Sequence, residues 1–278
     1  MRQPAVNLKH RIGSSVDDVT EHWIGWTFPP VGRAMAEANW SPDAAGDYCQ
    51  RCGDSVGPGE ATADGCATCR TGAELDGGIA DGVIRLGPYI EPLRGWVQAI
   101  KYQRWNEMGE ALGQLLGERI RVSGLVNLQE AIVVPLPMPW QRRIYRGVDH
   151  AALIAHALAR EIEAPVARLL ARVNTPPQVS LTPSERKRAG SRGMRIRRRW
   201  WGVGSGSVDG AHIVLVDDVR TTGSTLRAAT RLLRRLKPAR IVCAAIGVSD
   251  SAARRARKAA HERGGQPASD GFDGTTGR

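Results

Sequence analysis

Short runs of aliphatic residues divide the chain into alternating strands and helices. Residues 213–216 and 131–134 are continuous apolar runs, as found in strands buried on both faces of a parallel sheet. Further strands are expected from Val83 onward and over residues 241–248. Because helical patterns separate these runs, the sequence predicts an α/β fold: a parallel sheet flanked by helices.

Apolar residues at helical spacing predict the connecting helices. The i, i+3, i+4, i+7 pattern is continuous over residues 148–162 and recurs over 106–120. A shorter pattern surrounds residues 93–100, and another begins at 226 and is expected to end near Pro238. Strand, loop, helix and later strand make a βαβ arrangement.

Three glycines recur at every fourth position of the predicted helix over residues 106–120. Gly109, Gly113 and Gly117 lie on another side of this helix from its apolar residues. Glycine lowers helix propensity, so a structural reason for each is expected. We predict close packing of this side against a neighbouring element.

Two acids and a turn of small residues follow the run at 213–216. Asp217 and Asp218 come at the carboxyl end of the predicted strand, where open α/β sheets bind their ligands. The next segment, TTGST at 221–225, precedes a helix, and the backbone N–H groups of such a turn favour a phosphate. The acids can accept hydrogen bonds from sugar hydroxyls, and the adjacent turn can donate to a phosphate. Together they predict a ribose 5-phosphate site. The alternative is a buried strand followed by an ordinary capped helix.

Four of the five cysteines form two CxxC pairs separated by thirteen residues. Cys49, Cys52, Cys66 and Cys69 have the spacing of a structural zinc ribbon with no open coordination position. Metal binding would supply the folding free energy of this short segment, on the order of 10 kcal/mol or more. The alternatives are two disulfides, which a reducing compartment disfavours, or a redox CxxC, which needs no second pair. Cys243 is expected to be a small buried residue.

Composition and charge bound the class of protein. A chain of 278 residues accommodates one α/β domain with a small module. The net charge of +11 favours polyanionic partners, either nucleic acid or phosphorylated small molecules. The sequence has no apolar run of about 18 residues and no signal-peptide core, so we expect a cytoplasmic protein without membrane insertion.

Residues 213–225 resemble the 5-phosphoribosyl 1-pyrophosphate (PRPP) binding motif of the type I phosphoribosyltransferases, in which two acids and a TTG turn follow hydrophobic residues. The resemblance implies that Asp217 and Asp218 are the catalytic acids and contact the ribose 2- and 3-hydroxyls. It also implies Mg²⁺ between pyrophosphate and ribose oxygens. The positions implied to bind PRPP and its phosphate are Val219, Arg220, Thr221, Thr222, Gly223, Ser224 and Thr225.

Together with the double CxxC, further landmarks are similar to the ComF family of competence-associated phosphoribosyltransferase-like proteins. The family's PVP…R…RG signature is similar to the segment 135–147, and its R…T…Q segment to Arg172, Thr175 and Gln178. The resemblance covers roughly residues 47 to 250. The pyrophosphate or loop contacts that it implies are Pro135, Leu136, Pro137, Arg142, Arg143, Arg146, Lys101, Arg172, Gln178 and Arg186. The alternative for Arg142, Arg143 and Arg146, without the resemblance, is that they coat a solvated helix start.

The chain departs from the family pattern in the loops. Asp149 and His150 replace the family's Asn-Gln pair, and Ala189 and Met194 replace an asparagine and a phenylalanine. Substrate selection by these loops is therefore expected to differ.

The predicted domain order is an N-terminal extension over residues 1–46, a zinc ribbon over 47–71, a phosphoribosyltransferase-like domain over 83–250 and a tail over 251–278. The extension contains three tryptophans and no long periodic segment. The tail has little to bury, and its composition predicts disorder.

Residues 183–200 carry eight Lys or Arg against one Glu. Three interpretations of this basic segment are open: a loop that closes over the site, a nucleic-acid contact in which Trp200 or Trp201 stacks on an unpaired base, or a disordered loop.

Two functions stay open. One is an enzyme that transfers phosphoribosyl groups with release of pyrophosphate. The other is a non-catalytic factor of DNA uptake that binds single-stranded DNA, which the resemblance associates with a competence helicase.

Overall fold

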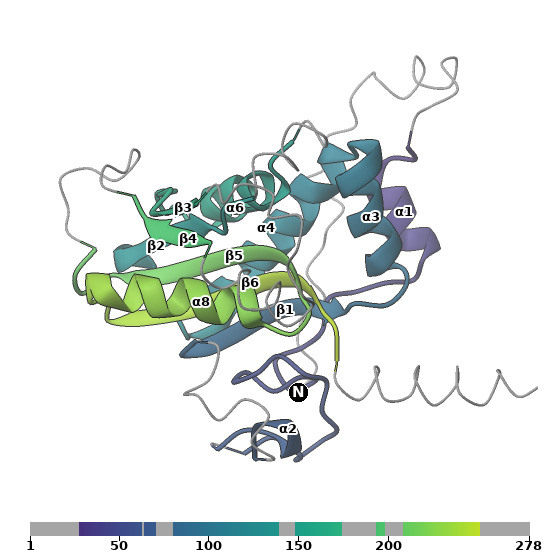
Figure 1. The fold of residues 1–278 in the computed structure, drawn as a ribbon. Helices are drawn as coiled ribbons and strands as arrows, with labels where there is room; N and C mark the ends of the chain where they lie inside the picture. The colour runs from purple at the N-terminus through teal and green to yellow at the C-terminus, as the bar shows by residue number, and fades with distance from the viewer. Residues whose placement is uncertain are drawn as a thin grey trace, which may run out of the picture.

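Four parallel strands form the central sheet, in the order β1-β6-β5-β2 (Figure 1). The computed structural model describes residues 28–62, 64–70, 80–138, 148–173, 193–197 and 208–250. The strands are β1 (Gly82–Pro88), β2 (Ala131–Pro135), β5 (His212–Arg220) and β6 (Arg240–Val248). They include every strand predicted from the apolar runs, and all neighbouring pairs are parallel. The predicted α/β fold is confirmed.

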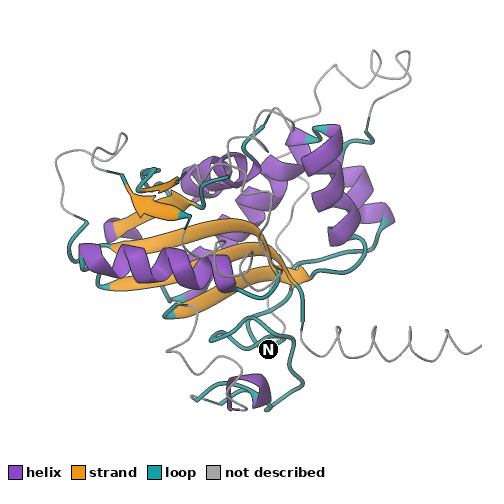
Figure 2. Ribbon diagram, in the orientation of Figure 1, coloured by secondary structure: helices purple, strands orange, loops and turns teal. Residues whose placement is uncertain are grey.

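Helices cover both faces of this sheet (Figures 1 and 2). Along β5, Val214 and Val216 belong to the apolar cluster with α3, α4 and α6, whereas Ile213 and Leu215 belong to the cluster with α8. Each strand therefore buries both sets of alternating side chains, which explains its uninterrupted apolar sequence. The helices are α3 (Leu93–Gln103), α4 (Asn106–Ser123), α6 (His150–Glu161) and α8 (Ser224–Leu233), and the last continues as the 3₁₀ turn η5 (Arg234–Leu236). The turn η4 (Leu128–Glu130) precedes β2.

The glycine row on α4 packs directly against α6, as its spacing predicts. A Cβ atom on Gly113 would lie 2.7 Å from both the Ala157 Cβ and the Ile154 carbonyl oxygen. A Cβ on Gly117 would lie 2.6 Å from the Glu161 Cβ. The two helix backbones therefore approach more closely than any larger side chain allows.

The strand order reverses beside β2. After β2 the chain passes through α6 and returns at Val166, which pairs with Val133 in a parallel bridge. The next strand of the sheet, β5, lies beside β2, and its helix α8 covers the opposite face from α6. Ligands of open α/β sheets bind at such a switch point, outside the carboxyl ends of the strands.

Two features were not predicted from the sequence. The helix α1 (Val31–Glu37) packs on the core near α3. The Phe28 ring stacks on Trp105 with ring centroids 4.5 Å apart, and the Trp40 ring meets Trp96 edge to face at 5.1 Å. A small two-stranded antiparallel sheet forms from β3 (Leu170–Arg172) and β4 (Met194–Ile196). Hence part of the predicted N-terminal extension, residues 1–46, belongs to the core. The strand β4 lies within the basic segment 183–200, where only a loop was expected.

No helix among the described residues is both long and apolar enough to cross a lipid bilayer.

Candidate functional site

The two acids of β5 line a cavity at the switch point. β5 and β2 are in register from Ala131 to Pro135, so the carboxyl ends of both strands open on the same edge. The cavity there has a volume of about 200 Å³. Its walls come from β5, from the loop after β2, and from α3, α6, α8 and β3. The lining residues are Lys101, Leu136, Pro137, Met138, Ala151, Arg172, Asp217, Asp218, Val219 and Thr225.

The two acids have different electrostatic environments. Asp218 Oδ2 pairs with Lys101 Nζ at 2.8 Å, and both side chains are less than a fifth exposed. Burial of the Asp217 carboxyl, assisted by the neighbouring charge of Asp218, raises the pKa of Asp217 to about 8. The Asp218 backbone N–H, which donates to Asp217 Oδ1 at 2.9 Å, and the charges of Lys101 and Arg172 oppose this shift. The cavity therefore holds one ion-paired and one largely protonated carboxyl at neutral pH.

The turn after β5 leads directly into the N-terminus of α8. Gly223 is the N-cap of α8 and adopts a left-handed conformation with φ of 69°, which favours glycine. As the cap residue it offers no side-chain acceptor to the first N–H groups of the helix. Thr221 and Thr222 are exposed, and Ser224 and Thr225 are half-buried. The Ser224 N–H makes only a long contact, 3.5 Å, with Thr222 Oγ1. The turn and the positive end of the α8 dipole therefore favour a phosphate.

A second cavity of about 180 Å³ shares Leu136, Pro137, Met138 and Arg172 with the first. It adds Pro135, Asp149, Arg168, Leu170, Ala171 and Arg197. Arg168 Nη1 lies 3.6 Å from Asp149 Oδ2. Asp149, which replaces the family's asparagine, also caps α6 by accepting from the Ala152 N–H at 3.3 Å. Three guanidinium groups against one carboxylate favour a further anionic group beside the acids.

The described part of the chain brings five of the ten predicted pyrophosphate or loop contacts together. Lys101, Arg172 and the Pro-Leu-Pro segment border the two cavities, and Arg172 Nε donates to the Pro137 carbonyl at 3.0 Å. Arg220 differs from the expectation, because its side chain is buried in an ion pair with Asp54 instead of facing the phosphate turn. The predicted residues Arg142, Arg143, Arg146, Thr175, Gln178, Arg186, Trp200 and Trp201 lie outside the described residues.

The four cysteines converge into one cluster in the segment that carries α2 (Ala67–Arg70). All four Sγ atoms lie within 4.8 Å of one another, with Cys49 to Cys69 at 3.9 Å and Cys52 to Cys66 at 3.6 Å. A tetrahedral zinc site with Zn–S bonds of about 2.3 Å requires S···S distances of roughly 3.8 Å, so the donor set fits zinc. A hydrogen bond from Cys52 lowers the pKa of Cys49 to about 4, which favours a thiolate there.

Cys243 is fully buried in β6, as its apolar surroundings predict.

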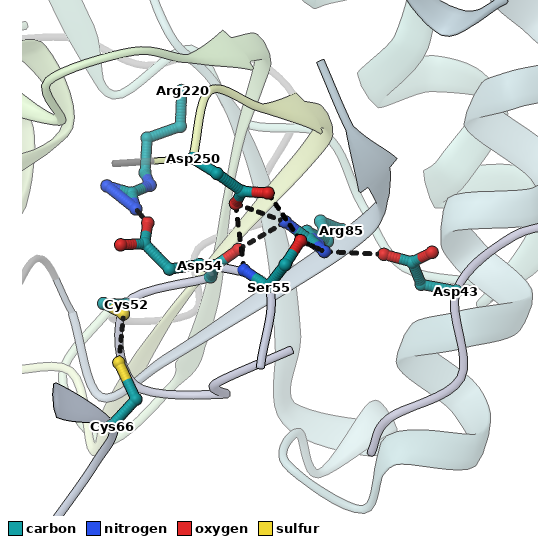
Figure 3. A network of polar contacts seen from close by, with 9 residues as sticks. Asp43, Cys52, Asp54, Ser55, Cys66, Arg85, Arg220 and Asp250 are labelled. Carbon is teal, nitrogen blue, oxygen red and sulfur yellow. Dashed lines mark hydrogen bonds and ion pairs between the residues drawn. The ribbon is translucent and has the colours of Figure 1, made fainter. Parts of the chain in front are cut away.

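A network of buried charges was not identified from the sequence. Arg85 in β1 and Arg220 at the end of β5 are 1% and 3% exposed and pair with Asp43, Asp54 and Asp250 (Figure 3). The only sequence signal is an arginine within the apolar run of β1. Its partners come from distant parts of the chain, so spacing alone does not reveal them.

Comparisons with known proteins agree with this arrangement. Residues 148–272 match the model of the phosphoribosyl transferase domain, a stretch that contains both acids of β5 and the following turn. The chain is 29% identical to Competence protein F of Haemophilus influenzae over 194 residues, which cover 68% of this chain and 79% of that protein. It is 32% identical to the DNA utilization protein YhgH of Shigella flexneri over 163 residues, covering 55% of this chain and 66% of that protein. Competence protein ComFC of Bacillus subtilis is 32% identical over 102 residues, covering 37% of this chain and 38% of that protein.

Proposed function

Because the chain belongs to the ComF family of phosphoribosyltransferase-like proteins, we propose that it binds PRPP, or a nucleotide with a ribose 5-phosphate, at the switch point between β2 and β5. The observation that carries this proposal is the adjacency of the acids Asp217 and Asp218 to the N-terminus of α8. A ribose 5-phosphate needs acceptors for two hydroxyls at one end and donors for a phosphate at the other. The chain supplies both within nine residues.

The proposed binding mode assigns a role to each polar group of the cavity. Asp218 accepts a hydrogen bond from one ribose hydroxyl. Asp217, which holds its proton near neutral pH, can both donate a hydrogen bond to the other hydroxyl and accept one from it. The amides of residues 221–225 donate to the 5-phosphate. Lys101 orients Asp218 through their 2.8 Å ion pair. Mg²⁺, brought in with PRPP, would neutralise phosphate charge while the acids hold the hydroxyls.

We further propose phosphoribosyl transfer at this site. The bond from C1 of the ribose to pyrophosphate breaks, pyrophosphate leaves with the electron pair, and an acceptor atom bonds to C1 and loses its proton. Arg168, Arg172 and Arg197 border the adjoining cavity and are suited to the charge of the leaving group. A protein that only senses PRPP uses the same contacts without turnover.

The test is a PRPP-dependent assay of pyrophosphate release with candidate bases, combined with calorimetric titration of PRPP. We expect the double variant Asp217→Asn/Asp218→Asn to lose PRPP affinity at least tenfold, whereas the exposed control Asp209→Asn retains it. Unchanged affinity in the double variant contradicts the site assignment. Binding without pyrophosphate release identifies a sensor and contradicts the transferase.

The cysteine cluster is proposed to hold one structural zinc ion. All four positions of a tetrahedral site are filled by sulfur, which leaves none for substrate. We propose that the ribbon comprises residues 47–71 and the phosphoribosyltransferase-like domain residues 83–250. Elemental analysis is expected to find about one zinc per chain.

A second candidate function is a role in DNA uptake through binding of single-stranded DNA in the cytoplasm. The relatives named for competence or DNA utilization suggest this role. In this chain, residues 219–249 contain no Asp or Glu, and Arg231, Arg234, Arg235 and Lys237 are exposed on α8 and the residues that follow it. For three phosphates neutralised, affinity for single-stranded DNA should fall about twentyfold between 50 and 200 mM salt. A response independent of salt contradicts this function, for which a competence helicase would be the protein partner.

A further inference from the structure

One buried guanidinium joins the cysteine segment to the sheet (Figure 3). Arg85 lies in β1, and its Nη1 donates to the Gly53 carbonyl at 2.8 Å and to Asp250 Oδ1 at 2.9 Å. Its Nη2 donates to Asp43 Oδ2 and Ser55 Oγ, both at 2.7 Å. A single side chain thus connects the ribbon both to the edge strand β1 and to Asp250, the second residue after β6.

A second ion pair of this network reaches the phosphate turn. Asp54, two residues after Cys52, accepts from Nη2 of Arg220, and neither side chain is more than 6% exposed. Arg220 is the last residue of β5 and directly precedes Thr221. The turn of residues 221–225 therefore starts from a residue whose side chain is held by the ribbon.

The ribbon is packed too tightly on the sheet to move independently at this point. A Cβ on Gly53 would lie 2.8 Å from Val83 Cγ1. The Val83 N–H also donates to the Gln50 carbonyl at 2.6 Å. Three consecutive residues carry these features: Cys52 belongs to the cysteine cluster, Gly53 packs against β1, and Asp54 forms the ion pair with Arg220. A displacement of Cys52 is therefore transmitted to Asp54.

We propose that Asp54 is a positioning residue: it holds Arg220 so that the turn of residues 221–225 keeps its ligand-binding conformation, and it thereby couples metal binding in the ribbon to ribose 5-phosphate binding. The coupling rests on the proposed ribose-phosphate site. The residues that line the 200 Å³ cavity include neither member of the pair, so Asp54 acts through the turn and not on the ligand.

Coupling between two binding sites is reciprocal, which allows a test on the unaltered chain. Zinc affinity is measured by competition with a chromophoric chelator, with and without saturating ribose 5-phosphate. We expect ribose 5-phosphate to raise zinc affinity about fivefold or more. Unchanged zinc affinity, under conditions where calorimetry shows ribose 5-phosphate bound, overturns the coupling. Failure of ribose 5-phosphate to bind at all contradicts the proposed function instead.

Amide hydrogen exchange tests the positioning role without any ligand. Asp54→Asn is expected to speed exchange about tenfold, at unchanged zinc content, at the Arg227 and Ser249 N–H groups, which donate to the Gly223 and Arg220 carbonyls at 2.8 Å. The control Asp43→Asn, which removes a different partner of Arg85, should leave these residues unchanged. Asp54→Glu, which keeps the charge, should restore slow exchange.

The variant Arg220→Gln removes the same ion pair without altering the ribbon sequence, so it covers the case in which Asp54→Asn loses its metal. It should speed exchange at the Arg227 and Ser249 N–H groups as much as Asp54→Asn does, and the double variant should add nothing further. Exchange equal to that of the wild type in Arg220→Gln, or additive effects in the double variant, overturns the positioning role.

Discussion

Replacing Asp217 by asparagine should stabilise the ligand-free protein, and more so as pH rises. The pKa of Asp217 is raised from 3.8 to about 8 in the folded chain, chiefly by burial. Above pH 4 the unfolded chain ionises this carboxyl while the folded chain retains the proton, so stability falls with rising pH until the folded group ionises. Asparagine has the shape of the neutral carboxyl and no such dependence.

The magnitude follows from this pKa difference. Each pKa unit corresponds to about 1.4 kcal/mol. Between pH 5.5 and 8 the unfolded carboxyl is ionised throughout, whereas the folded one reaches half-ionisation only at the upper end. The free energy of unfolding of the wild type should therefore fall by about 3 kcal/mol relative to Asp217→Asn over this range.

The assay is urea unfolding of both proteins at saturating zinc over this pH range, since protonation of the cysteines affects both chains equally. The adjacent control Asp218→Asn loses the ion pair with Lys101 and should be about 1–2 kcal/mol less stable than the wild type at pH 5.5. A constant difference between Asp217→Asn and the wild type from pH 5.5 to 8 would refute the reasoning.

Three further outcomes are expected. Gly113→Ala should lower the free energy of unfolding by about 1–3 kcal/mol, because its Cβ would lie 2.7 Å from the Ile154 carbonyl oxygen. The control Gly46→Ala, whose Cβ would have no atom within 4 Å, should change this free energy by less than about 0.5 kcal/mol, and equal effects contradict the close packing. Arg85→Met removes the ion-pair partner of the buried Asp250 and of the partly exposed Asp43 and should cost about 3–5 kcal/mol in urea unfolding, so a loss below about 1 kcal/mol contradicts the network. Chelation should unfold the ribbon, seen as fast amide exchange at residues 47–62, and slow exchange in metal-free protein contradicts a metal-dependent ribbon.

The sequence predicts those features that depend on local pattern. The continuous apolar runs locate the strands because both faces of the sheet are covered, and the glycine row marks the contact of α4 with α6. The cysteine spacing predicts the cluster for a similar reason, since two CxxC turns can place four sulfur atoms round one point. The acids and the turn after β5 are contiguous in the chain, so their adjacency in space needs no knowledge of the rest of the fold.

Contacts between distant segments could not be predicted in this way. Asp54 and Arg220 are separated by 166 positions, and Arg85 and Asp250 by 165, so only the folded chain shows which acid meets which arginine. The motif therefore predicted a phosphate contact for Arg220, whereas its side chain forms an ion pair with Asp54 of the ribbon. The strand β4 has three residues and one buried side chain, too few for a periodic signal.

The most direct test is a crystal structure of the protein with ribose 5-phosphate. The phosphate is predicted to accept hydrogen bonds from the amides of residues 221–225, with the ribose hydroxyls beside Asp217 and Asp218. Ligand density elsewhere, for example in the 770 Å³ cavity between the ribbon and Arg240, with the switch point empty, would contradict the assignment.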